Sequence, residues 1–318
     1  MNNSDKDRAE PYKKNEIQEQ ILEIMNHSLY KEELELINKF DKPKLPVIFI
    51  IGAQRSGTTL LMQLISQLFE VSYPNNFIAR YWNVPYIGAN LYKSLIKKSS
   101  ENNLDLSSDL GYTKGLEGPH EFSYFWKKWF PWDSWEKKAY DKIDYSILQK
   151  QLAAWESVNN APLVFKNLIQ IDYNIEKLYS LFSNSIFIYL KRDLSFNIQS
   201  TYKSRIKLFD DETKWFGVKP INYLELTKLP VLEQITKQVI CINNDIEDQL
   251  SNIPNKNVIN IKYEDLIKDY LCEINKIISL TKLQKLEINN KIELKSANKV
   301  SIRNNIFNQI SVMVKTFS

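Results

Sequence analysis

The chain has 318 residues, of which 43% are hydrophobic and 25% charged; this is a globular composition and excludes a disordered, collagen-like or coiled-coil chain. The formal net charge of +4 is too small to predict a nucleic-acid-binding protein by itself. The length allows one large domain or two ordinary ones. The two cysteines, Cys241 and Cys272, are too few for a disulfide framework, so we expect a reducing compartment.

The N-terminal residues show no targeting signal. Residues 1–15 are polar and charged, without the apolar stretch of a signal peptide, and we expect them to form a disordered tail. The longest apolar runs, such as Val47–Ile51, are far shorter than the roughly 20 residues that a membrane span needs. We therefore expect a cytoplasmic protein with no integral membrane segment.

The first structured segment is predicted to be helical. Apolar residues recur at helical spacing from Glu16 to Phe40, which predicts one helix, or a helical hairpin interrupted near Asn26–Ser28. Pro43 and Pro46 end this segment. Residues 16–42 are therefore predicted to form a helical N-terminal extension.

Short apolar runs alternate with helical patterns through the rest of the chain. Four runs rich in β-branched and aromatic residues predict buried strands, and each precedes a segment with helical spacing. The predicted strands are Val47–Ile51, Leu163–Phe165, Ile186–Leu190 and Asn257–Lys262, and the helices that follow them are Thr58–Phe69, Tyr173–Leu181, Ser195–Lys207 and Glu264–Leu280. This alternation predicts an α/β fold with a P-loop-type parallel sheet flanked by helices. We expect a single domain over residues 16–318, with helical insertions.

The junction after the first predicted strand indicates an anion site. It reads Gly52-Ala-Gln-Arg-Ser-Gly-Thr-Thr-Leu60, and it holds two of the seven glycines in the chain, which predicts a tightly curled backbone. Such a loop points its N–H groups inward, and the next helix adds the positive end of its dipole. The spacing is that of a Walker A loop, but Thr58 stands at the lysine position, which argues against ATP or GTP chemistry. Arg55 supplies a cation that can fork onto a terminal anionic group; an ordinary tight turn is the alternative.

These residues carry a family resemblance. The segment Gln54-Arg-Ser-Gly-Thr-Thr-Leu-Leu61 resembles the 5′-phosphosulfate loop of sulfotransferases that use 3′-phosphoadenosine-5′-phosphosulfate (PAPS). The form with arginine is similar to that of carbohydrate, tyrosylprotein and bacterial members. The resemblance implies that the donor is bound by Arg55, Ser56, Gly57, Thr58 and Thr59.

A second motif lies at the end of the third predicted strand. Arg192 directly follows the strand, and Ser200 comes eight residues later in the next predicted helix. Open α/β sheets bind ligands at the carboxyl ends of their strands, so this pair can converge on one phosphate. It resembles the 3′-phosphate site of the family, although Leu194 replaces the usual proline. The alternatives are an ion pair of Arg192 with Asp193 or Glu264, and a simple helix-face hydroxyl for Ser200.

Weaker matches occur along the chain. Lys166, at the end of the second predicted strand, resembles a lysine of bacterial members and would face the sulfuryl group or the acceptor; a structural salt bridge is the alternative. Lys262-Tyr-Glu-Asp-Leu266 resembles a segment that caps and packs in the family. No glycine-rich nucleotide motif occurs near the C-terminus, where Ser301 or Arg303 is a candidate replacement.

The candidate general base lies in a glycine-rich loop. Glycines 111, 115 and 118 precede Glu121, which suggests a loop shaped for close approach. The resemblance implies that a glutamate in this region removes the proton of the acceptor. Its neighbour His120 is the alternative, because an imidazole needs less tuning to act as a base near neutral pH. A solvated carboxylate beside a packed histidine is the non-catalytic interpretation.

The resemblance implies an in-line transfer of a sulfuryl group from PAPS to a hydroxyl or amine, with release of 3′-phosphoadenosine-5′-phosphate (PAP). The acceptor is expected to be a glycan, a lipid or a small molecule, and no nucleic acid is expected as a partner. No metal is expected, because the chain has two histidines and no HExxH or CxxC spacing. The alternatives are a P-loop nucleotide kinase, which leaves Arg192 and Ser200 unexplained, and a non-catalytic nucleotide-binding relative.

An aromatic segment follows the loop that carries Glu121. Within Phe122–Trp135, four of the seven tryptophans occur at every third position. Flat aromatic faces suit an acceptor wall, but large aromatic side chains are more often part of a core. We therefore favour a packed helix over a binding wall.

Overall fold

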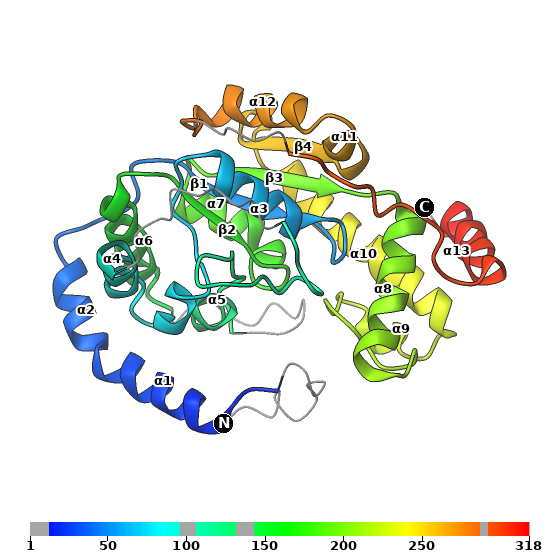
Figure 1. Cartoon of the computed structure of the whole chain (residues 1–318), viewed down its shortest axis with the longest axis horizontal. Coiled ribbons are helices and arrows are strands. Elements are labelled where there is room, and N and C mark those ends of the chain that lie inside the picture. The colour runs from blue at the N-terminus through cyan, green and yellow to red at the C-terminus, as the bar shows by residue number, and fades with distance from the viewer. Residues whose placement is uncertain (1–12, 96–105, 132–142, 287–291, 318) are drawn as a thin grey trace.

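The computed structural model describes residues 13–95, 106–131, 143–286 and 292–317; most of the predicted tail, residues 1–12, lies outside this part. Four parallel strands form one sheet in the order β2-β1-β3-β4 (Figure 1). Their bounds are Val47–Ile51 for β1, Leu163–Lys166 for β2, Ile186–Lys191 for β3 and Val258–Lys262 for β4. The predicted α/β fold with a parallel sheet flanked by helices is confirmed, and each strand agrees with its prediction to within one residue.

The register of the sheet brings the carboxyl ends of the strands to one edge. On β1, Ile50 pairs with Lys166 of β2, and Ile51 pairs with Tyr189 of β3. The residues that follow these three strands therefore emerge side by side. This is the edge at which open parallel sheets bind ligands.

Helices cover both faces of the sheet (Figure 1). Because side chains alternate along a strand, Ile48 and Ile50 of β1 enter the core under one set of helices, and Phe49 and Ile51 enter the other core. The first face is covered by α3 (Thr58–Leu68), α11 (Tyr263–Lys268) and α12 (Tyr270–Thr281). The second is covered by α5 (Ser123–Trp129), α6 (Tyr145–Asn159), α7 (Ile175–Leu181), α8 (Leu194–Phe209), α10 (Val231–Ser251) and α13 (Asn304–Phe317).

The N-terminal extension consists of two helices, α1 (Glu16–Ser28) and α2 (Tyr30–Ile37), separated at Leu29. The predicted break near Asn26–Ser28 is thus displaced by one residue. Buried Glu33 on α2 accepts hydrogen bonds at 3.0 Å from the backbone N–H groups of Tyr86 and Ile87. Glu33 thereby provides hydrogen-bond partners for two backbone N–H groups in the first turn of α4 (Pro85–Leu95). These bonds also attach the N-terminal extension to the rest of the protein.

Two helices differ from their predicted bounds. The predicted helix Glu264–Leu280 is divided into α11 and α12, because Asp269 leaves the helical conformation and accepts a hydrogen bond from the Cys272 N–H at 3.2 Å. The predicted helix Tyr173–Leu181 starts with a 3-10 turn before α7. The remaining short helices are η3 (Ile78–Tyr81), η4 (Asp172–Asn174), α9 (Tyr223–Leu226) and η5 (Asn255–Asn257).

The aromatic segment after Glu121 belongs to the core where the structure describes it. Phe125 and Trp126 of α5 have no exposed surface, and Trp129 is buried beside them. The Trp126 ring packs edge-on against Phe165 of β2, with their centroids 5.0 Å apart. The packing interpretation therefore holds for these residues, while Trp132 and Trp135 lie outside the described residues.

Candidate functional site

The loop between β1 and α3 is shaped by its two glycines. Gly52 and Gly57 have φ angles of 150° and 106°, a region that favours glycine. A Cβ atom on Gly52 would lie 2.5 Å from the carbonyl oxygen of Leu190, and one on Gly57 would lie 2.8 Å from the Tyr263 ring. Glycine is therefore required at both positions by close packing against β3 and α11.

The loop presents unpaired donors at the start of α3. Thr58 and Thr59 are the first two residues of this helix, and its N-cap residue, Gly57, provides no side-chain capping hydrogen bond. The hydroxyl of Ser56 is buried and has no hydrogen-bond partner among the described residues. Unpaired N–H groups and a buried hydroxyl at a helix N-terminus are the groups that bind an anion.

The two predicted anion motifs meet in space. The Nε atom of Arg55 donates a hydrogen bond to the hydroxyl of Ser200 on α8 at 3.1 Å. An Nη1 proton of Arg192 is donated to the backbone carbonyl of Arg55 at 2.9 Å. The sequence predicted one anion cradle on each motif, and the structure places the two against each other.

Arg192 makes no direct salt bridge within the described residues. Its Nε donates to the side-chain carbonyl of Asn298 at 2.8 Å, and Asn298 in turn donates to Glu264 at 2.7 Å. Its guanidinium lies 4.7 Å from the centre of the Tyr263 ring. Burial lowers the pKa of Arg192 from its ordinary value, while Tyr263 and Glu264 raise it. The predicted alternative of an ion pair with Asp193 or Glu264 is thus replaced by a bridge through Asn298.

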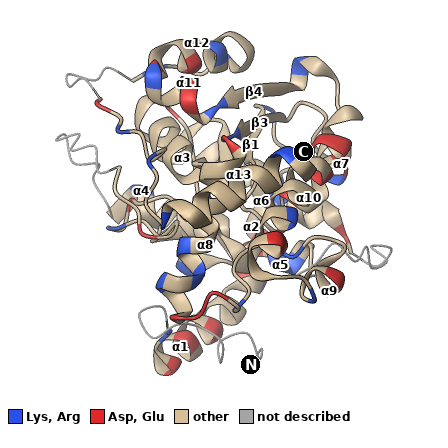
Figure 2. Ribbon diagram, turned by 90° about the vertical axis from the view of Figure 1, so that its right-hand side faces the viewer, with Lys and Arg blue, Asp and Glu red and all other residues tan. Residues whose placement is uncertain are grey.

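α8 begins at Leu194, the position at which the family usually has a proline. Asp193 caps the helix by accepting a hydrogen bond from the Phe196 N–H at 3.1 Å, and Leu194 is its first residue. α8 also carries the basic residues shown on it in Figure 2, among them Lys203 and Lys207. Ser200 lies in the second turn of the helix. The Asp193 cap therefore fixes the first residue of the helix, as a proline at this position would.

A third group of residues gathers beside the loop. Lys166, at the end of β2, is buried and donates a hydrogen bond to the hydroxyl of Thr59 at 3.3 Å. It also forms an ion pair with Glu121. The backbone carbonyl of Glu121 accepts a hydrogen bond from the side chain of Asn167 at 3.2 Å. The predicted alternative, a salt bridge, is present between Lys166 and Glu121, and Lys166 also lies beside the loop at Thr59.

The two candidate bases differ in how they are held. The Nδ1 atom of His120 accepts a hydrogen bond from the Phe122 N–H at 2.9 Å, so one ring nitrogen is engaged by the backbone. Burial lowers the pKa of His120, which keeps the imidazole neutral near pH 7. The carboxylate of Glu121 is more open, with its side chain 36% exposed. The open carboxylate therefore has the better access to an incoming molecule.

A small cavity adjoins this group. Its volume is about 10 Å³, and its walls include Gly111 together with Thr59, Met62, Pro119, His120, Glu121 and Lys166. A Cβ atom on Gly111 would lie 3.6 Å from the Thr59 hydroxyl and 4.0 Å from the Glu121 carboxylate. The cavity thus lies between the loop and the two candidate bases.

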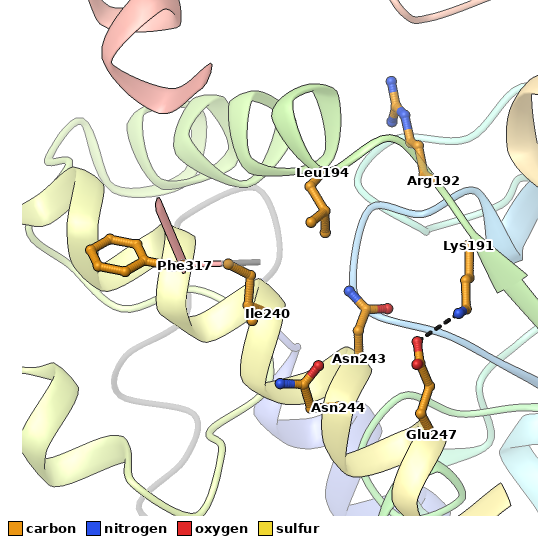
Figure 3. Close-up of a pocket in the computed structure, with 8 residues that line it drawn as sticks. All are labelled: Lys191, Arg192, Leu194, Ile240, Asn243, Asn244, Glu247 and Phe317. Atoms are coloured by element: carbon orange, nitrogen blue, oxygen red, sulfur yellow. Dashed lines mark ion pairs between the residues drawn. The ribbon is translucent and has the colours of Figure 1, made fainter. Parts of the chain in front are cut away.

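A larger cavity lies beside the end of β3, and Lys191 and Arg192 are among the residues that line it. It has a volume of about 280 Å³ and is bounded by α8, α10 and the end of α13. In Figure 3 the Arg192 side chain points away from it, while Lys191 forms an ion pair with Glu247 at 2.7 Å. This cavity does not contain the loop residues or Glu121.

Several residues of the site were not predicted. Asn167, Asn298 and Tyr263 contact predicted site residues, although the sequence assigned none of the three a role in binding or catalysis. Asp172 is fully buried behind the loop. Burial raises the pKa of Asp172 well above its ordinary value, against the influence of the Gly52 backbone amide and of Lys166. Tyr263 lay in a segment that the sequence had singled out, and Asn167 directly follows Lys166 in another, whereas Asn298 lay in none.

The two candidate C-terminal residues have different surroundings. The hydroxyl of Ser301, which is exposed, accepts a hydrogen bond from Lys203 of α8 at 2.9 Å. Arg303 is exposed. Among the described residues, no three histidine, cysteine, aspartate or glutamate side chains are grouped to hold a metal ion. No helix in the same residues is long and apolar enough to cross a membrane.

Comparisons with known proteins agree with this picture. The family model described as the sulfotransferase family matches residues 46–287, roughly three quarters of the chain. No curated protein matches the chain.

Similar solved structures include sulfotransferase STF9 from Mycobacterium avium, with 14% identity and a TM-score of 0.49, covering 92% of this chain and 72% of that one. Sulfotransferase STF1 from Mycobacterium tuberculosis H37Rv has 12% identity and a TM-score of 0.48, covering 81% of this chain and 72% of its own. A sulfotransferase domain from the curacin biosynthetic pathway has 16% identity and a TM-score of 0.41, covering 76% of each chain.

Proposed function

The chain belongs to the sulfotransferase family, and we propose that it transfers a sulfuryl group from PAPS to a hydroxyl or amine of an acceptor molecule. PAP is the second product. The acceptor is a glycan, a lipid or a small molecule, and the reaction takes place in the cytoplasm. Two free thiols, Cys241 and Cys272, are in line with a reducing compartment.

One observation carries this proposal. The Arg55 guanidinium donates to the Ser200 hydroxyl at 3.1 Å, and Arg192 donates to the Arg55 carbonyl at 2.9 Å. Two cationic groups from separate motifs therefore adjoin one another at the carboxyl ends of β1 and β3. A nucleotide with an anionic group at each end of its ribose fits such a pair, because each group meets its own arginine.

The loop is assigned to the 5′-phosphosulfate. The N–H groups at the start of α3, the buried Ser56 hydroxyl and Arg55 together supply donors around the glycine backbone. Gly57, Thr58 and Thr59 contribute backbone N–H groups. Donors fixed in place before the reaction stabilise the negative charge that develops on sulfuryl and leaving oxygens. An oxygen of such a ligand would also accept a hydrogen bond from the buried Ser56 hydroxyl.

Glu121 is assigned the role of general base, with Lys166 as its partner. Lys166 contacts both the Glu121 carboxylate and the Thr59 hydroxyl, so its charge adjoins the base and the phosphosulfate loop at once. In this role Glu121 accepts the proton of the acceptor hydroxyl, and Lys166 stabilises the negative charge on the transferred group. His120 is the second candidate, but its Nδ1 atom is engaged by the Phe122 N–H.

The other two functions explain fewer observations. A nucleotide kinase gives no role to Arg192 and Ser200, and Thr58 stands where its loop lysine would be. A non-catalytic nucleotide-binding protein has no need for an acidic side chain beside the loop. Glu121 lies there, in contact with Lys166, and this favours an enzyme.

The test is a transfer assay with sulfur-labelled PAPS and pools of hydroxyl and amine acceptors. We expect label on one acceptor class and release of PAP in equal amount. The variant Glu121→Gln serves as the control, and it should bind the donor without transferring label. Label transfer by Glu121→Gln at the wild-type rate would contradict the assigned base, and wild-type protein that binds PAP but modifies no pool would support the non-catalytic alternative.

A further inference from the structure

A segment before α13 passes the carboxyl end of β3 (Figure 1). We call residues 296–303 the C-terminal strap. It lies beyond the match with the family model, which ends at residue 287. On one side the Ala297 N–H donates a hydrogen bond to the hydroxyl of Tyr263 at 3.0 Å, and this joins the strap to α11.

α8 holds the strap from the other side. The side-chain amide of Gln199 donates to the Lys299 carbonyl and accepts from the Ser301 N–H, both at 2.9 Å. Lys203 donates to the Ser301 hydroxyl at 2.9 Å. The strap is thus fixed at both ends of the stretch that contains Asn298.

Asn298 is the residue of the strap that reaches Arg192. Its side-chain oxygen accepts a hydrogen bond from the Arg192 Nε at 2.8 Å. Its side-chain nitrogen donates to Glu264 at 2.7 Å, and Glu264 also accepts from the Asp193 N–H at 3.1 Å. Because both ends of the amide are used, the side chain has one defined orientation between a cation and a carboxylate.

This arrangement determines which donors of Arg192 remain for a ligand. Asn298 engages Nε, and the Arg55 carbonyl engages one proton of Nη1. The Tyr263 ring lies against the guanidinium, 4.7 Å from its carbon. An arginine has five N–H donors, so three, on Nη1 and Nη2, have no partner among the residues that the structure describes. These three are sufficient for a forked contact with a phosphate.

We propose that Asn298 is a positioning residue that orients Arg192 toward the 3′-phosphate of the donor; this rests on the proposed function. A neutral amide holds the guanidinium without neutralising it. It also stands between Arg192 and Glu264, which would otherwise compete with the phosphate for the same charge. The strap thereby makes the site selective for nucleotides that carry a 3′-phosphate.

The test compares two nucleotides by titration calorimetry: PAP, and adenosine 5′-phosphosulfate, which lacks the 3′-phosphate. We expect Asn298→Ala to weaken PAP binding about tenfold, the usual effect of losing a hydrogen bond to a charged group. Binding of adenosine 5′-phosphosulfate should change less than about twofold. The matched control is Asn244→Ala, which removes an exposed asparagine of α10 and should leave both affinities unchanged.

A double-mutant cycle separates positioning from a general structural effect. If Asn298 acts through Arg192, adding Asn298→Ala to Arg192→Ala should cause no further loss of PAP affinity. Asn298→Asp provides a second variant of nearly the same size, whose carboxylate would pair with Arg192 and repel both Glu264 and the phosphate. It should also weaken PAP binding, by at least as much as the alanine variant.

The outcomes for this inference and for the proposed function are distinct. Wild-type protein that does not bind PAP would overturn the proposed function. Wild-type protein that binds PAP, together with Asn298 variants that bind it equally well, would overturn only the positioning role. Equal losses for both nucleotides, or losses that add to that of Arg192→Ala, would assign Asn298 a structural role instead.

Discussion

The Nε atom of Arg55 donates a hydrogen bond to the hydroxyl of Ser200 at 3.1 Å, across 145 residues of sequence. Arg55 belongs to the loop after β1, and Ser200 belongs to the helix after β3. The adjacent parallel strands bring these residues together, since their carboxyl ends share one edge. The contact brings together two motifs that the sequence predicted to bind the two ends of the donor.

The first prediction concerns Arg55. Removal of its charge in Arg55→Ala should lower the transfer rate about 100-fold, as for the loss of a donor aimed at developing charge. Arg55→Lys keeps the charge but cannot form the forked contact, so its loss should be smaller, about tenfold. Single-turnover rates with saturating PAPS measure both. A lysine variant that is no better than the alanine variant would show that geometry alone, and not charge, matters here.

The second prediction separates the two candidate bases. Glu121→Gln should reduce turnover at least about 100-fold while leaving PAP affinity within about twofold, because the loop donors are untouched. His120→Asn should retain turnover within about fivefold, since the asparagine oxygen can still accept from the backbone N–H as Nδ1 does. The kinetics of both variants with one acceptor decide the assignment. The reverse ranking would transfer the role of base to His120.

The third prediction locates the acceptor. Gly111 faces the small cavity beside Thr59 and Glu121, where an added Cβ would lie 3.6 Å and 4.0 Å from their oxygens. Gly111→Ala should raise the KM for the acceptor about tenfold and leave donor affinity unchanged. Gly115→Ala is the matched control, because Gly115 also has a positive φ, of 74°, but meets no atom within 4 Å. Equal effects of the two variants would attribute the change to backbone strain.

The fourth prediction concerns stability and pH. Burial lowers the pKa of His120 in the folded chain below its ordinary value of 6.5. The unfolded chain therefore binds a proton at higher pH than the folded chain does, and this part of the stability is lost as the pH falls through 6.5. His120→Asn should lose less stability than the wild type between pH 7.5 and pH 5.5. Urea unfolding at the two pH values measures this, and an equal loss in both proteins would show that His120 does not titrate differently on folding.

Local patterns were sufficient to predict the sheet and the loop. Runs such as Val47–Ile51 are apolar throughout and mostly β-branched, which is typical of strands buried on both faces. The tight loop could be predicted from the glycines at positions 52 and 57, because only glycine fits the close contacts with Leu190 and Tyr263. These features depend on a few neighbouring residues, so the sequence displays them directly.

The contacts that complete the site depend on the tertiary fold. Asn298 reaches Arg192 across 106 residues, and nothing in the residues around it distinguishes it from a surface asparagine. The division between α11 and α12 was missed for a different reason. Asp269 lies within a continuous helical pattern, and its cap on Cys272 outweighs that pattern at one point.

The most direct test of the account is a crystal structure of the protein with PAP. We expect one nucleotide, with its 5′-phosphate in the loop at Arg55 and its 3′-phosphate on Arg192 and Ser200. Such a complex would also show whether Glu121 faces the end of the loop where an acceptor must arrive. A nucleotide that contacts only one of the two arginines, or two ligands held separately by Arg55 and Arg192, would contradict the account.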